Sequence, residues 1–161
     1  MERHFTVTGF VIDSDRTLLH WHQKTQMWLP PGGHVDPDED PVQAVLREVG
    51  EECGIAAEVV PHVAPLPFGV PAQVAPPYAI LVEDIPQGPH QHIDMIYFVR
   101  PVAGGVRVAG SEDFVWVTAQ QLRDNEPLPI GDCGPAVAPP EDVRLLALRG
   151  MELLAAVDAG R

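Results

Sequence analysis

The chain has 161 residues, of which 45% are hydrophobic and 20% are charged, and this is typical of one globular domain spanning residues 1–161. Its formal net charge of −13 argues against nucleic acid as a partner, because a phosphate backbone is bound mainly through Lys and Arg. The sequence contains neither an apolar run long enough to cross a membrane nor a secretory signal pattern, so we expect a cytoplasmic protein with no membrane partner.

The expected elements begin with two strands, at 4–12 and 17–22, which alternate like a hairpin. The adjacent prolines of segment 28–33 predict a rigid turn. Strands are then expected at 56–63, 78–83, 93–102 and 114–117, and helices at 119–123 and at about 140–158. The strand at 93–102 is apolar enough to be a buried central strand.

Two segments, 61–89 and 125–140, are rich in proline or glycine. Proline fixes φ and removes a backbone donor, so we expect ordered loops or sheet edges there. Long loops in small domains often carry recognition. We therefore expect residues 65–92 to determine which ligand the chain binds. The alternative is that they only connect two elements of the fold.

One further helix is signalled by its two ends. Asp40 can serve as the N-cap, Pro41 takes the first helical position, and Gln43 can close a capping box. Gly54 suits the left-handed position that ends a helix. The apolar residues of this helix share one stripe that should face the core: Val42, Val45, Leu46, Val49 and Cys53.

The other face of this helix is acidic. Glu48, Glu51 and Glu52 are spaced i, i+3 and i+4, which places them on one patch. Such like charges repel, and Arg47, four residues before Glu51, relieves only part of the repulsion. Carboxylate oxygens are the ligands that Mg²⁺ and Mn²⁺ prefer. The triplet alone indicates either a metal site or a solvated acidic face.

The residues around the patch decide between these alternatives. The segment reads Gly33, five residues, Glu39, seven residues, Arg47-Glu48-Val49, one residue, Glu51-Glu52, one residue, Gly54-Ile55. It resembles the complete box of the Nudix hydrolase family, and the order of elements around it resembles that family over most of the chain.

The resemblance implies an α/β fold, namely an α/β/α sandwich around a mixed β-sheet. It also implies Mg²⁺-dependent hydrolysis, with Mn²⁺ as a substitute ion, of a diphosphate bond in a nucleoside diphosphate linked to another moiety. The substrate would be a small nucleotide-like molecule of the ADP-ribose, sugar nucleotide or nucleoside triphosphate class. A homodimer is left open.

Two relatives of different function serve as alternatives. One is a non-catalytic nucleotide-sensing domain, and the other resembles a prenyl diphosphate isomerase. Both have lost or altered the box, so the intact Glu48, Glu51 and Glu52 argue against them.

The resemblance also implies how the box binds metal. Glu48, Glu51 and Glu52 would hold the ion, and a backbone carbonyl at Gly33 or its neighbour Gly32 would be a further ligand. Glu51 or Glu48 would act as the general base, and this choice stays open.

Other positions of the box have supporting roles in the family. Arg47 would complete the catalytic set by orienting the glutamates. Glu39 and Gly54 would be structural, with Glu39 bracing the loop against the helix.

Outside the box, some family members carry another metal-binding or basic carboxylate before a late strand. Glu112 is the candidate by position, followed by Asp94 and Glu83. The alternative for Glu112 is a solvated surface carboxylate.

His90, His92 and Asp94 alternate ahead of the expected central strand and so share one face. They are candidate contacts for substrate phosphate or ribose, with a zinc site and plain strand-edge polarity as alternatives. Trp28 or Trp21 could stack on a nucleobase, and core packing is the alternative for both.

Overall fold

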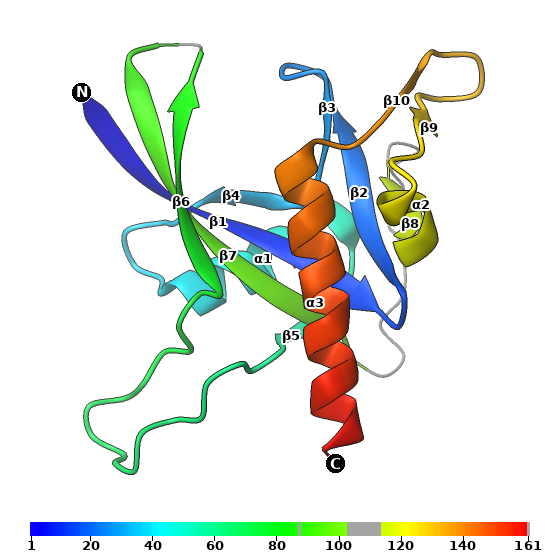
Figure 1. The fold of residues 1–161 in the computed structure, drawn as a ribbon. Coiled ribbons are helices and arrows are strands. Elements are labelled where there is room, and N and C mark those ends of the chain that lie inside the picture. The colour runs from blue at the N-terminus through cyan, green and yellow to red at the C-terminus, as the bar shows by residue number, and fades with distance from the viewer. Residues whose placement is uncertain (87, 103–113, 161) are drawn as a thin grey trace.

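The computed structural model describes residues 1–86, 88–102 and 114–160 (Figure 1). Its strands are β1 (Glu2–Asp13), β2 (Arg16–His22), β3 (Met27–Leu29), β4 (Gly32–His34), β5 (Ala57–Val59), β6 (Ala79–Ile85), β7 (His90–Pro101), β8 (Phe114–Thr118), β9 (Leu128–Pro129) and β10 (Ala136–Val137). Its helices are α1 (Pro41–Cys53), α2 (Ala119–Arg123) and α3 (Glu141–Ala159). None of the helices in the described residues is both long and apolar enough to span a membrane.

The main sheet is built on a parallel pair, β1 and β7, whose register runs from Glu2 opposite His90 to Val11 opposite Val99. On the other side of β7, strands β5 and β6 pair antiparallel with it. Strands β2 and β4 pair antiparallel with β1, and β3 and β8 extend the sheet from β2. The sheet is therefore mixed, as predicted.

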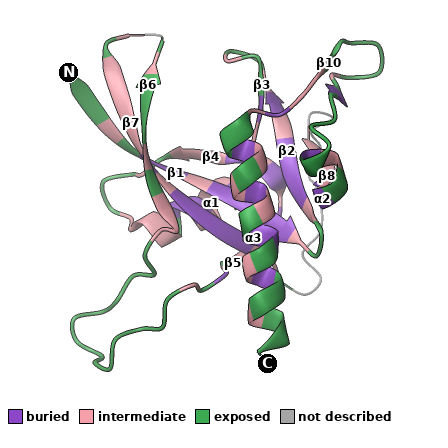
Figure 2. Cartoon of the chain, in the orientation of Figure 1, coloured by how far each residue is buried: buried purple, intermediate pink, exposed green. Residues whose placement is uncertain are grey.

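Helices α1 and α3 cover opposite faces of this sheet (Figure 1). Successive side chains of a strand point to opposite faces, and β1 supplies both layers. Its Val7 and Val11 pack in the cluster beneath α1, whereas Phe10 and Ile12 pack in the cluster beneath α3. Buried residues follow the strands where the helices cross them (Figure 2). This arrangement is the predicted α/β/α sandwich.

Several predicted boundaries were wrong. The turn expected at 28–33 holds the ends of two short strands, β3 and β4, and only Pro30-Pro31 separates them. The strand expected at 56–63 shortens to β5, because Pro61 lacks the N–H that a longer strand would need. Strand β7 begins earlier than expected, at His90, because β1 pairs with it from His90 to Val99.

Candidate active site

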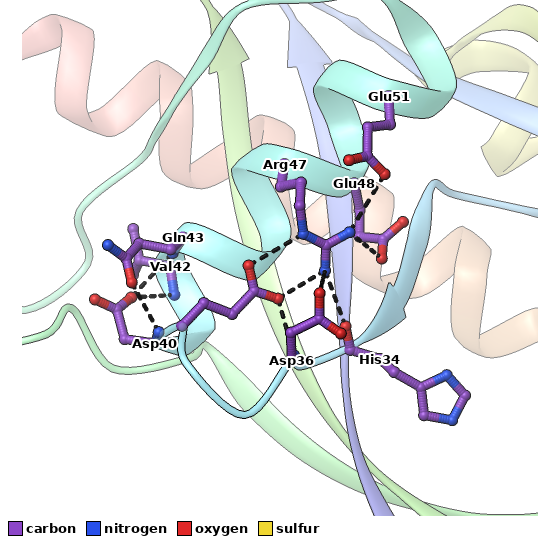
Figure 3. Close-up of polar contacts among 9 residues, drawn as sticks. His34, Asp36, Asp40, Val42, Gln43, Arg47, Glu48 and Glu51 are labelled. Atoms are coloured by element: carbon purple, nitrogen blue, oxygen red, sulfur yellow. Dashed lines mark hydrogen bonds and ion pairs between the residues drawn. The ribbon is translucent and has the colours of Figure 1, made fainter.

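Helix α1 begins and ends where the sequence predicts. The Asp40 side chain accepts hydrogen bonds from the Val42 and Gln43 amides at 2.8 and 2.9 Å (Figure 3). The Gln43 side chain accepts one in return from the Asp40 amide, which completes the capping box. Gly54 takes a left-handed conformation, φ 64°, that ends the helix. These caps fix where the helix begins and ends, and its buried residues Ala44, Val45, Val49 and Cys53 face the sheet.

Arg47 connects the acidic face of α1 to the loop before it (Figure 3). It donates to both carboxylate oxygens of Glu39, at 2.6 and 3.0 Å, and to the His34 carbonyl at 3.1 Å. It also donates to Glu48 at 2.7 Å and, more weakly, to Glu51 at 3.3 Å. The guanidinium lowers the pKa of Glu39. One cation thus braces the loop through Glu39 and orients two of the three glutamates of the acidic patch, Glu48 and Glu51.

Two glycines of β4 lie close to the glutamates. A Cβ at Gly33 would collide with the Glu48 carboxylate, and a Cβ at Gly32 would collide with the Val7 carbonyl oxygen. The Gly32 amide donates to Glu52 Oε2 at 3.3 Å. Without side chains at these positions, the β4 backbone can approach the carboxylates of α1.

The carboxylate cluster, by which we mean Glu48, Glu51 and Glu52, is a suitable donor set for a hard divalent cation. Burial raises the pKa of Glu52 to about 7, and the charges of Glu48 and Glu51 add to this, while the Gly32 hydrogen bond opposes it. A nearby dication would offset this cost of ionisation, and carboxylate and carbonyl oxygens are what Mg²⁺ prefers. The residues therefore fit the expected ion.

Glu52 also borders a cavity of about 330 Å³ between the sheet and the start of α3. This volume is at the lower end of the range for small-molecule sites. The strands supply Thr6, Val7, Thr8, Phe10, His20, His22, Leu29, Gly32, Gly33, His34, Leu81, Glu83, His92, Asp94 and Ile96, and Pro30, Glu52, Asp142, Val143 and Leu146 complete the lining.

Asp94 is a buried carboxylate of this cavity, with only 4% of its surface exposed. It accepts hydrogen bonds from the hydroxyls of Thr6 at 2.9 Å and Thr8 at 2.8 Å. Burial raises the pKa of Asp94, and the two threonine hydrogen bonds oppose the increase. Asp94, Thr6 and Thr8 therefore form a hydrogen-bonded polar group on the face of the sheet beneath α3.

The NUDIX domain model matches residues 2–132 of the sequence. The chain belongs to the Nudix family. A Nudix-family hydrolase from Clostridium perfringens shares 25% sequence identity, with a TM-score of 0.72, and the alignment covers 96% of this chain and 99% of that one. Family membership and this relative support the predicted pyrophosphohydrolase class.

Curated relatives match over a shorter segment. An asymmetrical bis(5'-nucleosyl)-tetraphosphatase from Caenorhabditis elegans is 58% identical over 26% of this chain and 30% of its own length. An m7GpppN-mRNA hydrolase from Bos taurus is 55% identical over 26% of this chain and 16% of its own length. The similarity thus spans less than a third of either relative.

The candidates outside the Nudix box have different surroundings. Among the described residues, the cavity lining includes His92 and Asp94 but not His90.

Trp28 is only 2% exposed and packs edge-to-face against the buried Trp21, with ring centroids 5.6 Å apart. Trp28 is therefore a core residue, and the idea that it stacks on a substrate was wrong. Glu112 lies outside the described residues.

Only the later part of segment 65–92 reaches the cavity. Its cavity-lining residues are Leu81, Glu83 and His92, on β6 and β7. The prolines earlier in the segment lie in a loop that protrudes from the sheet (Figure 1). Residues 63–76 of this loop are exposed throughout. The proline-rich loop does not form a wall of the cavity.

Among the polar lining residues that sequence reasoning missed are Thr6, Thr8, His34 and Asp142. Thr6 and Thr8 gave a signal, because they place two hydroxyls on the same face of a strand whose other residues are mainly apolar. His34 and Asp142 gave none, since each reaches the cavity only through the packing of β4 and α3.

Proposed function

We propose that this Nudix protein is a Mg²⁺-dependent pyrophosphohydrolase that cleaves a diphosphate bond in a nucleoside diphosphate linked to another moiety, with Mn²⁺ able to replace Mg²⁺. The observation that carries the proposal is the position of Glu52, which belongs to the carboxylate cluster and also borders the cavity. A substrate in the cavity would bring its diphosphate to that cluster. The intact box argues against a non-catalytic sensor and against an isomerase.

Glu48, Glu51 and Glu52 would hold the ion, together with a backbone carbonyl at Gly32 or Gly33. When bound, the ion supplies positive charge that offsets the diphosphate and makes water more acidic. Glu48 is tied to Arg47 at 2.7 Å and is only 14% exposed, whereas Glu51 is 63% exposed and its Arg47 contact is 3.3 Å. A less constrained and more exposed carboxylate comes more readily within hydrogen-bond reach of a water molecule. Glu51 is therefore the better candidate for the group that takes the proton from water.

The cavity lining supports a nucleoside-containing substrate. Ionised Asp94 and Asp142 repel phosphate but accept hydrogen bonds from ribose hydroxyls or from the amino groups of a base. The phosphates would then lie at the Glu52 end. The matched segments of the dinucleoside tetraphosphatase and the cap hydrolase point to the same substrate class.

The test is hydrolysis by the purified chain of a panel of dinucleoside polyphosphates, ADP-ribose, nucleotide sugars and nucleoside triphosphates, with identification of the products. We expect turnover with Mg²⁺, loss of turnover after exhaustive chelation and recovery when Mg²⁺ is returned, because the carboxylate cluster needs a cation. Hydrolysis that continues undiminished after chelation would contradict the mechanism, and a panel without turnover would contradict the substrate class.

A further inference from the structure

The parallel pairing of β1 with β7 gathers histidines at one end of the sheet. Its register places His4 opposite His92 and Glu2 opposite His90. Because alternate residues of a strand share a face, His90 and His92 point to the same side. One ring nitrogen from each of His4, His90 and His92 lies within 4.8 Å of the other two. All three residues are partly buried.

A fourth imidazole adjoins these three. The His34 ring on β4 lies 5.3 Å from the His4 ring and 5.1 Å from the His92 ring, between centroids. His34 Nε2 is 3.4 Å from His4 Nδ1, and a carboxylate oxygen of Glu2 is 3.2 Å from His4 Nε2. We call His4, His34, His90 and His92 the histidine cluster.

The surroundings of His92 favour the neutral form of its ring. Burial lowers the pKa of His92, and the neighbouring His34, His90 and His4 lower it further. Neutral imidazole is the form that binds metal ions. In a chain of net charge −13, four histidines gathered at one place form a nitrogen-rich site in acidic surroundings.

We propose that His4, His90 and His92 form a binding site for a divalent ion of the zinc class. Imidazole nitrogens suit Zn²⁺ and similar transition ions, whereas Mg²⁺ prefers oxygen. Zinc–nitrogen bonds of about 2.0–2.1 Å in a tetrahedron place the nitrogens about 3.3 Å apart. Small ring rotations would bring the three nitrogens together from their present separations, and the fourth position would remain open.

This site would lie at the rim of the substrate cavity, because His92 and His34 belong to its lining. It shares no side chain with the carboxylate cluster. The same cavity is lined by Glu83, Asp94 and Asp142, so an ion at the histidine cluster would bring positive charge to an acidic wall. Its open position could accept an oxygen of a bound molecule.

The first experiment is calorimetric titration of ZnCl₂ into the full chain in saturating Mg²⁺, which occupies oxygen sites. We expect saturable binding of one Zn²⁺, which His4→Gln and His92→Gln each weaken at least ~10-fold because a ligand is lost. His62→Gln is the matched control, since His62 lies outside both the cluster and the cavity lining. Circular dichroism of each variant establishes that it is folded.

The second experiment needs no variant. Co²⁺ added to the wild-type chain should give the visible absorption of a four-coordinate ion and should broaden the ring-proton resonances of His4, His90 and His92. The proposal is overturned if Zn²⁺ binding is not saturable, or if His4→Gln and His92→Gln bind as the wild type does. It is also overturned if only His22→Gln weakens binding, because the ion would then lie elsewhere in the cavity.

Discussion

The carboxylate cluster of α1 and the histidine cluster of β1, β4 and β7 are assembled in opposite ways. The three glutamates occupy positions 48 to 52 of one helix, so helical geometry alone brings them together. His4 and His92 are neighbours only because two distant strands pair in parallel. The first cluster is visible as a spacing in the sequence, and the second is visible only when the register of the sheet is known.

The two clusters also differ in chemistry. Oxygen donors held by Arg47 suit a hard ion, whereas grouped imidazoles suit a borderline one. Both adjoin one cavity, through Glu52 and His92 respectively. A small domain can therefore present both oxygen and nitrogen donors to one ligand, although only the oxygen donors belong to a sequence motif.

The largest loss of turnover is expected from substitutions in the carboxylate cluster. Glu52→Gln and Glu51→Gln should each lower kcat at least ~10²-fold, because a metal ligand or the base is lost. Glu39→Gln should cost less, since Glu39 acts through Arg47. Steady-state kinetics on folded variants measures this.

Glu152→Gln is the matched control, an exposed glutamate of α3 paired with Arg149. If Glu39, Glu51 and Glu52 variants all show small and similar losses, the chemistry takes place elsewhere.

An intermediate effect is expected at Gly33, where the β4 backbone lies close to the Glu48 carboxylate. Gly33→Ala puts a Cβ against the Glu48 carboxylate, so we expect the Mg²⁺ concentration for half activity to rise about 10-fold as the ligand is displaced. Gly50→Ala is the control on α1, because a Cβ there meets nothing within 4 Å. It should keep its activity and stabilise the helix by about 0.5–1 kcal/mol. Identical metal titrations for the two variants would show that Gly33 is not needed for close approach.

The smallest effect concerns Asp94, which lies in the cavity that both clusters adjoin. Its pKa is raised by burial above the ordinary 3.8, so the folded chain holds this proton more tightly than the unfolded chain. The free energy of unfolding should therefore fall as pH rises from about 4 through the folded pKa. Asp94→Asn should remove this part of the slope, measured by urea unfolding between pH 4 and 8. Asp84→Asn, on exposed β6, should keep the wild-type slope, and equal slopes for wild type and Asp94→Asn would refute the assignment.

Local signals predicted α1 well, because Asp40, Gln43 and Gly54 act on neighbouring backbone groups. The apolar run at 93–102 predicted the central strand, and the resemblance carried by the Nudix box implied the α/β/α class. They could not predict the cavity, since its lining depends on strand register and on where α3 crosses the sheet. Trp28 illustrates the limit: the sequence left both base stacking and core packing open for it, and the pairing of β2 with β3 buries it against Trp21.

The pairing of β1 with β7 also bears on how the chain is made. The first strand cannot obtain its full parallel partner until Val99 has left the ribosome. Until then, β1 side chains such as Val7, Phe10 and Val11 lack half of the sheet that buries them in the finished protein. Contacts between residues so far apart in sequence form slowly, and exposed apolar strands associate with other chains meanwhile. Nascent chains stalled before β7 should therefore be the species most dependent on chaperones.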